Sequence, residues 1–191
     1  SAFYRIPVKM GAQKMSELFD IAFISGLIGA TMRMATPIIF ATLGEILAER
    51  SGVLNLGIEG IMLMGAMTGF LVTFSSGSIW TGVLAAALVG MLLGLLMAFL
   101  AVDLGLSQHV SGLGITLFST GLAMFIYRLS VGSPTVPPTI APFKQLTLPV
   151  LSKIPVIGPG LFTQYSLTYV AWLLIPLMSI LLYKTKLGLK I

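Results

Sequence analysis

The sequence has no cysteine, one histidine and only six acidic residues among 191. The absence of cysteine excludes disulfides, thiolate metal sites and thiol nucleophiles. The single histidine and the scattered acids form neither paired carboxylates at a defined spacing nor a set of metal ligands, and no P-loop is present. The sequence therefore predicts no metal centre, and a chain that neither is an enzyme nor hydrolyses nucleotide itself.

Charge is also scarce, at 9% of residues, whereas soluble domains carry about a quarter. The chain is 57% hydrophobic, with a mean hydropathy of +1.03. No charged residue falls between Glu59 and Asp103, and only His109 interrupts the run from Leu104 to Tyr127. Each run exceeds the roughly 20 residues that one transmembrane helix needs. The net charge of +5 does not indicate nucleic-acid binding, because the basic residues are scattered and cluster only near the two ends. The expected environment is a lipid bilayer.

The predicted fold class is all-α, a polytopic transmembrane helical bundle. Residues 1–20 are predicted to form a polar tail and residues 21–184 the transmembrane region. The segment 130–165 holds seven of the ten prolines, so it is predicted to be a long connection rather than a continuous helix. Small residues four apart predict close helix contacts, at Gly65 and Gly69 and at Ala86, Gly90 and Gly94. Five apolar segments predict the spans, at about 21–47, 58–74, 80–102, 110–127 and 166–183.

The stretch Ser51–Gly60 places an amide, a carboxylate and three glycines between two apolar segments. At membrane depth, irregular backbone persists only where protein or a water-filled cavity satisfies its polar groups. We expect Gly52, Gly57 and Gly60 to end one helix and admit the next. Thr36-Pro37 reads as an N-cap and first-turn proline, which predicts a kink or restart inside the first span. Together these features predict a broken or re-entrant helix pair.

Asn55 and Glu59 are the candidate solute ligands of this stretch. Transporter sites favour discontinuous helices, and the two side chains offer donors and acceptors suited to hydroxyl or amine groups. A structural role stays open for both, since Asn55 can cap the second helix and Glu59 can stabilise its first turn. Arg33 either lies at an interface or lines a pathway. Glu45 and Glu49, four residues apart, are read as a solvated helix end.

The lysines after the fifth span predict its orientation. By the positive-inside tendency this end is cytoplasmic, which places the proline-rich loop outside. Trp80, Tyr127 and Tyr165 then fall on one membrane face, as an aromatic belt would. Five spans leave the amino terminus outside although it carries three basic residues, which conflicts with the same tendency. The lysines are Lys184, Lys186 and Lys190.

The segments Thr36–Glu45 and Glu49–Ala66 strongly resemble the permease subunits of bacterial ABC importers, in the subgroup linked to nucleosides and simple sugars. Related branched-chain amino-acid permeases have a histidine in place of Glu59, and ribose-type permeases carry a different acidic motif there. The likeness covers nearly everything from residue 17 onward. Further matches are Val110–Leu113, Ile154–Pro159 and Tyr183–Lys190.

The resemblance implies a transport mechanism in the bacterial cytoplasmic (inner) membrane. A second permease subunit completes a hetero- or homodimer, cytoplasmic ATPase subunits bind ATP-Mg, and an extracytoplasmic solute-binding protein delivers the solute. This chain would hold no cofactor of its own. The external loop 130–165 would help to receive the binding protein, and the lysines after the fifth span would lie on the ATPase side.

Two departures from the family pattern qualify these expectations. Thr116 stands where relatives often have asparagine, so it is grouped with Asn55 and Glu59 on the expected substrate pathway. Residues 185–191 are expected to begin the ATPase-coupling loop, so the chain is expected to be a fragment, the N-terminal part of a longer permease. The alternatives are a branched-chain amino-acid permease of the same family and a non-transporting membrane assembly subunit.

Overall fold

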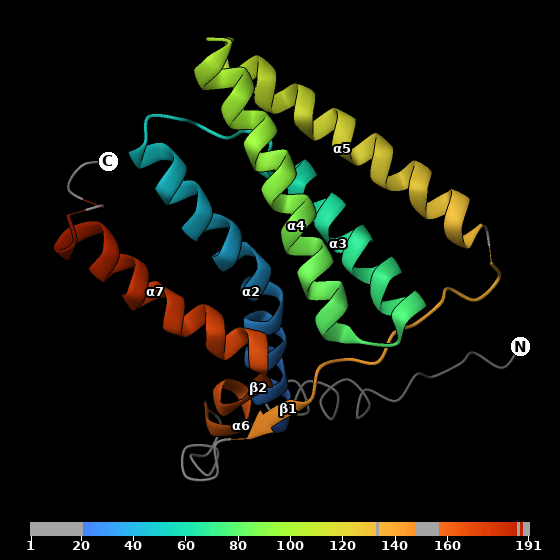
Figure 1. The fold of residues 1–191 in the computed structure, drawn as a ribbon. Helices are drawn as coiled ribbons and strands as arrows, with labels where there is room; N and C mark the ends of the chain where they lie inside the picture. The colour runs from blue at the N-terminus through green and yellow to red at the C-terminus, as the bar shows by residue number, and fades with distance from the viewer. Residues whose placement is uncertain (1–20, 133, 148–156, 187, 189–191) are drawn as a thin grey trace, which may run out of the picture. The chain divides into compact units, whose positions relative to one another are not determined.

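The computed structural model describes residues 21–132, 134–147, 157–186 and 188 (Figure 1). The predicted polar tail, residues 1–20, lies outside the described residues. The chain divides into two compact units. Unit 1 takes residues up to 38 together with 144–176, and unit 2 takes residues 39–143 together with those from 177 onward. The long helices α2 (Ile21–Arg50) and α7 (Ser166–Lys184) are each divided between the two units, with the first part in unit 1 and the rest in unit 2.

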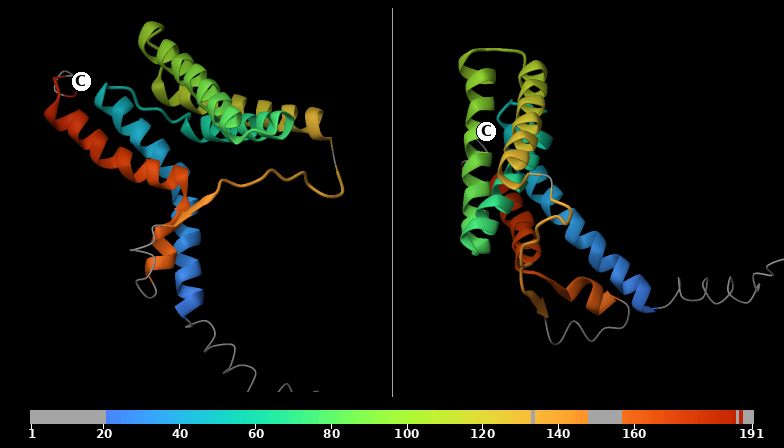
Figure 2. Two further views of the ribbon diagram at one scale, coloured as in Figure 1. Left: turned by 60° about the horizontal axis from the view of Figure 1, so that its bottom comes forward. Right: turned by 90° about the vertical axis from the view of Figure 1, so that its right-hand side faces the viewer.

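Unit 2 is built around α3 (Ile58–Ser76), which packs against both α4 (Ile79–Ala98) and α5 (Gln108–Val131). These three helices lie side by side in Figures 1 and 2. A short π-helix, η1 (Phe99–Asp103), continues α4 without a break. Long, mostly apolar runs make these helices, because an apolar span must satisfy its own backbone through helical hydrogen bonds.

The contact between α3 and α4 depends on small residues. A Cβ atom at Gly82 would lie 2.6 Å from the carbonyl oxygen of Gly69 and would overlap the Thr73 hydroxyl. A Cβ atom at Gly69 would lie 3.4 Å from the Cβ of Ala86. The two backbones therefore touch, as expected where small residues let membrane helices approach. The predicted stripe is confirmed at Gly69 and Ala86, whereas Gly94 has nothing within 4 Å.

Unit 1 combines the first halves of α2 and α7 with α6 (Ile157–Phe162) and two short strands. Strand β1 (Gln145–Thr147) pairs antiparallel with β2 (Thr163–Tyr165), with Leu146 opposite Gln164. The Gln164 side chain is fully buried, and its Nε2 donates to the carbonyl oxygens of Gly29 and Gly160. This amide ties β2 to α2 and α6.

The five predicted spans are confirmed. Five helices are long and apolar enough to cross a membrane, and many of their large apolar side chains are exposed, as a lipid-facing surface requires. Within the described part of 130–165, no continuous helix forms, as predicted. The sequence did not predict the small β1–β2 pair or α6. The spans are Phe23–Arg50, Ile58–Ser76, Ile79–Asp103, Gln108–Val131 and Ser166–Lys184.

Of the predicted kink or restart at Thr36-Pro37, the restart is wrong, because α2 continues through Pro37 without interruption. The Thr36 hydroxyl donates to the Met32 carbonyl oxygen at 2.8 Å, one turn earlier in the same helix. The Thr36 oxygen also lies 3.0 Å from the hydroxyl of Thr168 on α7. Because the Thr36 hydrogen is already donated to Met32, Thr168 is the donor of this second bond. Thr36 therefore joins two helices instead of capping one. A proline inside a membrane helix is tolerated where neighbouring groups satisfy the freed backbone.

Candidate solute-pathway segment

The break between α2 and α3 comprises residues Ser51–Gly57, all in unit 2. It begins with backbone bonds that close the last turn of α2, including Val53 N–H to the Ala48 carbonyl oxygen at 2.9 Å. Gly52 has φ +83°, a left-handed conformation that glycine adopts without strain. The chain then runs on without helical hydrogen bonds to Gly57, where α3 begins. The predicted break is thus confirmed at Gly52 and Gly57, whereas Gly60 lies inside α3.

Side chains from two other helices satisfy the backbone of the break. Gln108, at the start of α5, accepts from Leu54 N–H at 2.8 Å and donates from Nε2 to the Gly52 carbonyl oxygen at 3.0 Å. Glu45, on α2, accepts from Asn55 N–H through Oε1 at 2.8 Å. The Thr116 hydroxyl, on α5, donates to the Leu56 carbonyl oxygen at 3.0 Å. These bonds meet the condition under which irregular backbone survives at membrane depth.

Glycines bring the break and the start of α3 into direct contact with α5. A Cβ atom at Gly60 would lie 2.5 Å from the Thr116 Cα and 2.8 Å from its carbonyl oxygen. A Cβ atom at Gly112 would lie 2.9 Å from the backbone nitrogen of Leu56. Any side chain at Gly60 or Gly112 would therefore collide with backbone. Gly60, predicted as part of the break, acts as a packing residue.

The structure brings two of the predicted pathway residues to one peptide. Asn55 and Thr116 are both half-buried and flank the Leu56–Gly57 peptide. The Asn55 Oδ1 accepts from Gly57 N–H at 3.0 Å and so closes a turn just before α3, whereas the N-cap residue of α3, Gly57, makes no side-chain cap bond. Glu59 lies one turn further on, exposed in the first turn of α3. Among the described residues, no hydrogen bond or ion pair engages its carboxylate.

Glu45 and Gln108 are functional candidates that the sequence did not indicate. The interpretation of Glu45 as part of a solvated helix end is wrong, because its Oε1 holds the break and its Oε2 is buried without a partner in the described part of the chain. Glu49 is exposed, as predicted. The one available signal was the placement of Glu45 two helical turns before a stretch whose N–H groups lack helical partners. Gln108 is 54 residues away from its partner Leu54 in the sequence, so no local sequence pattern could have predicted their hydrogen bond.

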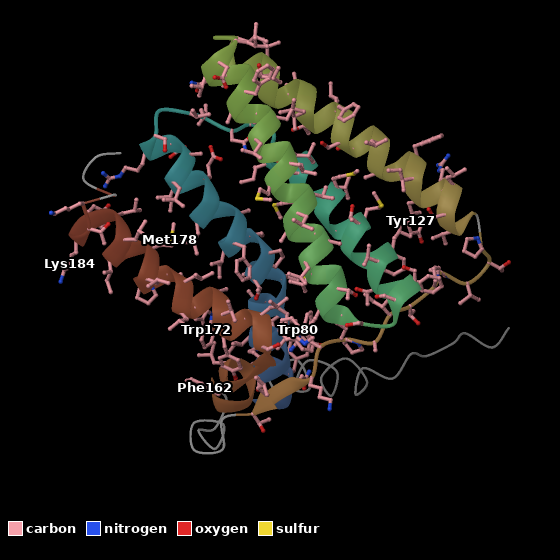
Figure 3. All side chains as sticks on the ribbon, in the orientation of Figure 1. Trp80, Tyr127, Phe162, Trp172, Met178 and Lys184 are labelled. Carbon is pink, nitrogen blue, oxygen red and sulfur yellow. The ribbon has the colours of Figure 1, made fainter. Side chains whose placement is uncertain are left out.

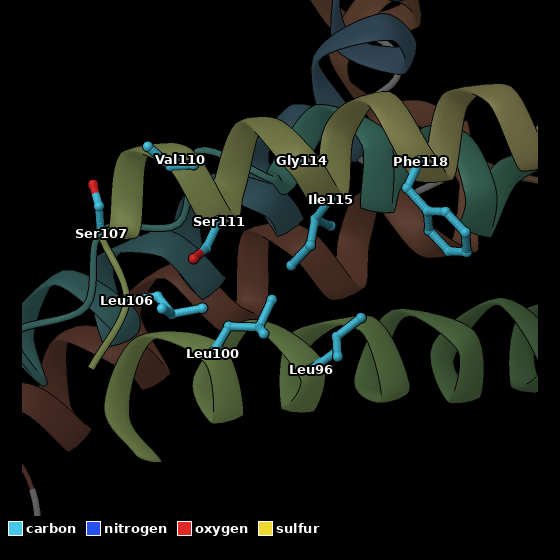
Figure 4. Close-up of a pocket in the computed structure, with 9 residues that line it drawn as sticks. All are labelled: Leu96, Leu100, Leu106, Ser107, Val110, Ser111, Gly114, Ile115 and Phe118. Atoms are coloured by element: carbon cyan, nitrogen blue, oxygen red, sulfur yellow. The ribbon is translucent and has the colours of Figure 1, made fainter. Parts of the chain in front are cut away.

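An apolar pocket of about 420 Å³ lies between α5 and the end of α4 with η1 (Figure 4). Its walls include Leu96, Leu100 and Phe118, and the only polar side chains that line it are those of Ser107 and Ser111. Such a lining offers too few hydrogen-bond partners for a polar solute. The sequence-predicted pathway residues are absent from this lining.

The lysine-bearing end of α7 and the end of α2 meet in unit 2. The Arg50 guanidinium carbon lies 5.0 Å from the centre of the Tyr183 ring, a cation–π distance. Lys184 and Lys186 are exposed beyond this contact, and Figure 3 shows Lys184 at the end of α7. Lys190 lies outside the described residues. Because Arg50 directly precedes the break, the break lies at the same end of unit 2 as these lysines.

Comparison with known proteins decides the family. Residues 27–191 match the family model described as "Branched-chain amino acid transport system / permease component". The chain belongs to this permease family. It follows that the permease is a multi-pass membrane protein, consistent with its five apolar helices.

Three curated relatives resemble the permease over most of its length. A Haloferax volcanii protein described as a glucose ABC transporter permease is 39% identical over 90% of this chain. A guanosine ABC transporter permease of Bacillus subtilis is 33% identical over 90%, and a nucleoside ABC transporter permease of Lactococcus lactis subsp. cremoris is 34% identical over 82%. The permease spans about half the length of these relatives: the matched part covers 52%, 56% and 51% of their respective chains. No solved structure matches it.

Proposed function

We propose that this permease forms part of the solute pathway of an ABC importer for nucleosides or simple sugars in a cytoplasmic membrane. The observation that carries the proposal is the break Ser51–Gly57, an irregular segment between two apolar helices whose backbone is satisfied by Glu45, Gln108 and Thr116. Transporter sites are built from such discontinuous helices. The relatives named for glucose, guanosine and nucleosides favour the solute class.

The proposed pathway residues are Asn55, Glu59 and Thr116. Asn55 lies in the break and carries an amide, Glu59 lies in the first turn of α3 and carries a carboxylate, and Thr116 lies in α5 and carries a hydroxyl. A neutral sugar or nucleoside has many hydroxyl groups, each both a donor and an acceptor. A small set of polar side chains on a mostly apolar wall suits the binding of such a solute.

The permease family implies an ATPase and a solute-binding protein as partners in general. We propose that the ATPase docks at the end of α7 where Lys184 and Lys186 are exposed, and that ATP-Mg is bound by that partner. A second permease subunit, identical or related, would complete the pathway. The segment 130–165 would face the solute-binding protein on the opposite side.

Uptake of labelled solutes tests the proposal. Cells that express the complete operon in a host lacking its own importers are given guanosine, uridine, glucose, ribose and leucine separately. The proposal expects uptake of at least one nucleoside or sugar and none of leucine. Uptake of leucine alone would falsify the solute assignment and favour an amino-acid permease.

A double variant separates transport from a purely structural subunit. Asn55→Ala combined with Glu59→Ala should abolish uptake while the purified complex keeps all its subunits. A subunit that only anchors or assembles its partners would retain activity in this variant. Preserved uptake with both side chains removed would therefore overturn the assignment of the break as the pathway.

A further inference from the structure

The hydrogen bonds of the break fix the polarity of Asn55, a residue that the sequence left open as donor or acceptor. A backbone N–H can only donate, so the side-chain atom that faces Gly57 N–H at 3.0 Å must be the amide oxygen. The oxygen of Asn55 is therefore engaged within the chain. That bond uses one lone pair of the oxygen, whereas the amide nitrogen keeps both of its hydrogens for a ligand.

The backbone of Asn55 is held as firmly as its side chain. Glu45 Oε1 accepts from Asn55 N–H at 2.8 Å, and Gln108 accepts from the preceding residue, Leu54, at the same distance. With both neighbouring N–H groups bound, the residue cannot turn its amide round without breaking the bond to Gly57. Pre-organisation of this kind is what a specificity-determining donor requires, because the donor need not be ordered when the solute arrives.

The amide nitrogen of Asn55 is open to a partner. The residue is half-buried, and within the part of the chain that the structure describes no group accepts from its Nδ2. Thr116 has the opposite polarity, since its single hydroxyl hydrogen is donated to the Leu56 carbonyl oxygen and only lone pairs remain. The carboxylate of Glu59 also accepts only when ionised. Asn55 is thus the one donor among the three proposed pathway side chains.

We propose that Asn55 is a specificity-determining residue that donates a hydrogen bond to a hydroxyl oxygen of the solute's sugar moiety. The inference rests on the proposed function, and it names the group that is recognised. Glucose is a sugar and a nucleoside contains one, so sugar hydroxyls are the groups that the proposed solute classes have in common.

The isosteric variant Asn55→Asp tests the polarity directly. The aspartate keeps an oxygen for Gly57 N–H, and Asp is as good as Asn in such a turn, so the break should fold. The two donor hydrogens are lost. Uptake of labelled guanosine or glucose by the assembled importer should fall by about three- to tenfold, the range expected when one hydrogen bond is lost. Ser75→Asp, in the exposed last turn of α3, adds the same charge away from the break and should leave uptake within about twofold.

Solute analogues provide a second measurement that does not depend on the variant folding. Each sugar hydroxyl is replaced in turn by hydrogen or by fluorine, and each analogue competes with the labelled solute in the wild-type importer. Fluorine can weakly accept a hydrogen bond and cannot donate one. At one position the fluoro analogue should therefore compete several-fold better than the deoxy analogue, and Asn55→Asp should abolish that difference.

The uptake of Asn55→Asp and the competition by the analogues each test whether Asn55 donates a hydrogen bond to the solute. Wild-type uptake within about twofold in Asn55→Asp overturns the proposal, and so does a series in which fluoro and deoxy analogues compete equally at every position. Failure of the proposed function looks different, because the unaltered importer would then take up none of the nucleosides or sugars.

Discussion

The paired hydrogen bonds of Gln108 allow a graded prediction. Gln108→Met removes both bonds to the break at nearly constant side-chain volume. It leaves the half-buried Leu54 N–H without its acceptor, which costs about 1–3 kcal/mol, and it removes a bond to the Gly52 carbonyl worth about 0.5–1.5 kcal/mol. Because Gly52 is exposed, water can replace that second bond. The expected loss of unfolding free energy is therefore about 1–3 kcal/mol, most of it from the unpaired Leu54 N–H.

Gln108→Glu separates the two bonds. The carboxylate still accepts from Leu54 N–H, whereas the donor to the Gly52 carbonyl is gone, so the expected loss is only about 1 kcal/mol. His109→Met is the matched control. His109 is the next residue of α5 and is exposed, and its replacement should change the unfolding free energy by less than about 0.5 kcal/mol.

Unfolding in mixed micelles with increasing SDS, followed by the fluorescence of the two tryptophans, measures these differences. The order of stability should be wild type, then Gln108→Glu, then Gln108→Met. Uptake should fall in the same order, because the two Gln108 bonds also fix the position of Asn55, which follows Leu54. If the unfolding free energy of Gln108→Met lies within about 0.5 kcal/mol of that of the His109→Met control, the two Gln108 bonds contribute nothing to stability and the reasoning is refuted.

Three further predictions concern packing and buried hydrogen bonds. Gly60→Ala should destabilise by about 1–3 kcal/mol in the same unfolding assay, because its Cβ would lie 2.5 Å from α5 backbone, whereas Gly114→Ala, with nothing within 4 Å, should be no less stable than the wild type, since alanine favours a helix over glycine. Glu45→Leu should cost about 1–3 kcal/mol by leaving Asn55 N–H unpaired, and Glu45→Gln, which keeps an acceptor oxygen, should restore most of that loss. Thr168→Val should cost about 1 kcal/mol, since it removes a buried hydroxyl contact between α2 and α7; equal stability of variant and wild type would contradict that contact.

The sequence predicted the spans and the break because both are local. A run of apolar residues longer than the bilayer core can hardly be anything but a transmembrane helix. Glycines at 52 and 57 beside Asn55 interrupt such runs, and the structure has its irregular segment there. The same local reasoning failed at Pro37, where a bond from Thr36 back to Met32 and a contact with Thr168 replace the expected cap. That contact spans 132 residues, so no window of sequence contains it.

The partners of the break were beyond sequence reasoning for the same physical cause. Asn55 could be recognised by its type and setting, but Gln108 and Thr116 bond to residues 54 and 60 positions away. Glu45 is only ten positions from Asn55, yet its role follows from the chain folding back at Gly52, which exposes an N–H group toward the helix it has just left. A residue's type indicates that it can bond, while the tertiary fold decides to what.

The distribution of hydrogen bonds is what favours the proposed pathway over a plain turn between two spans. A turn in water needs no side chains to satisfy it, and a continuous apolar helix satisfies itself. The break does neither, since it draws on Glu45, Gln108 and Thr116 in a chain that holds only six acidic residues. Each of these partners, if lost, would leave a polar group unpaired at a cost of about 1–3 kcal/mol. Asn55 completes the network with its oxygen alone, so its amide nitrogen is surplus to the fold. A donor that folding does not use, held rigidly beside a network that folding does use, is what solute recognition requires.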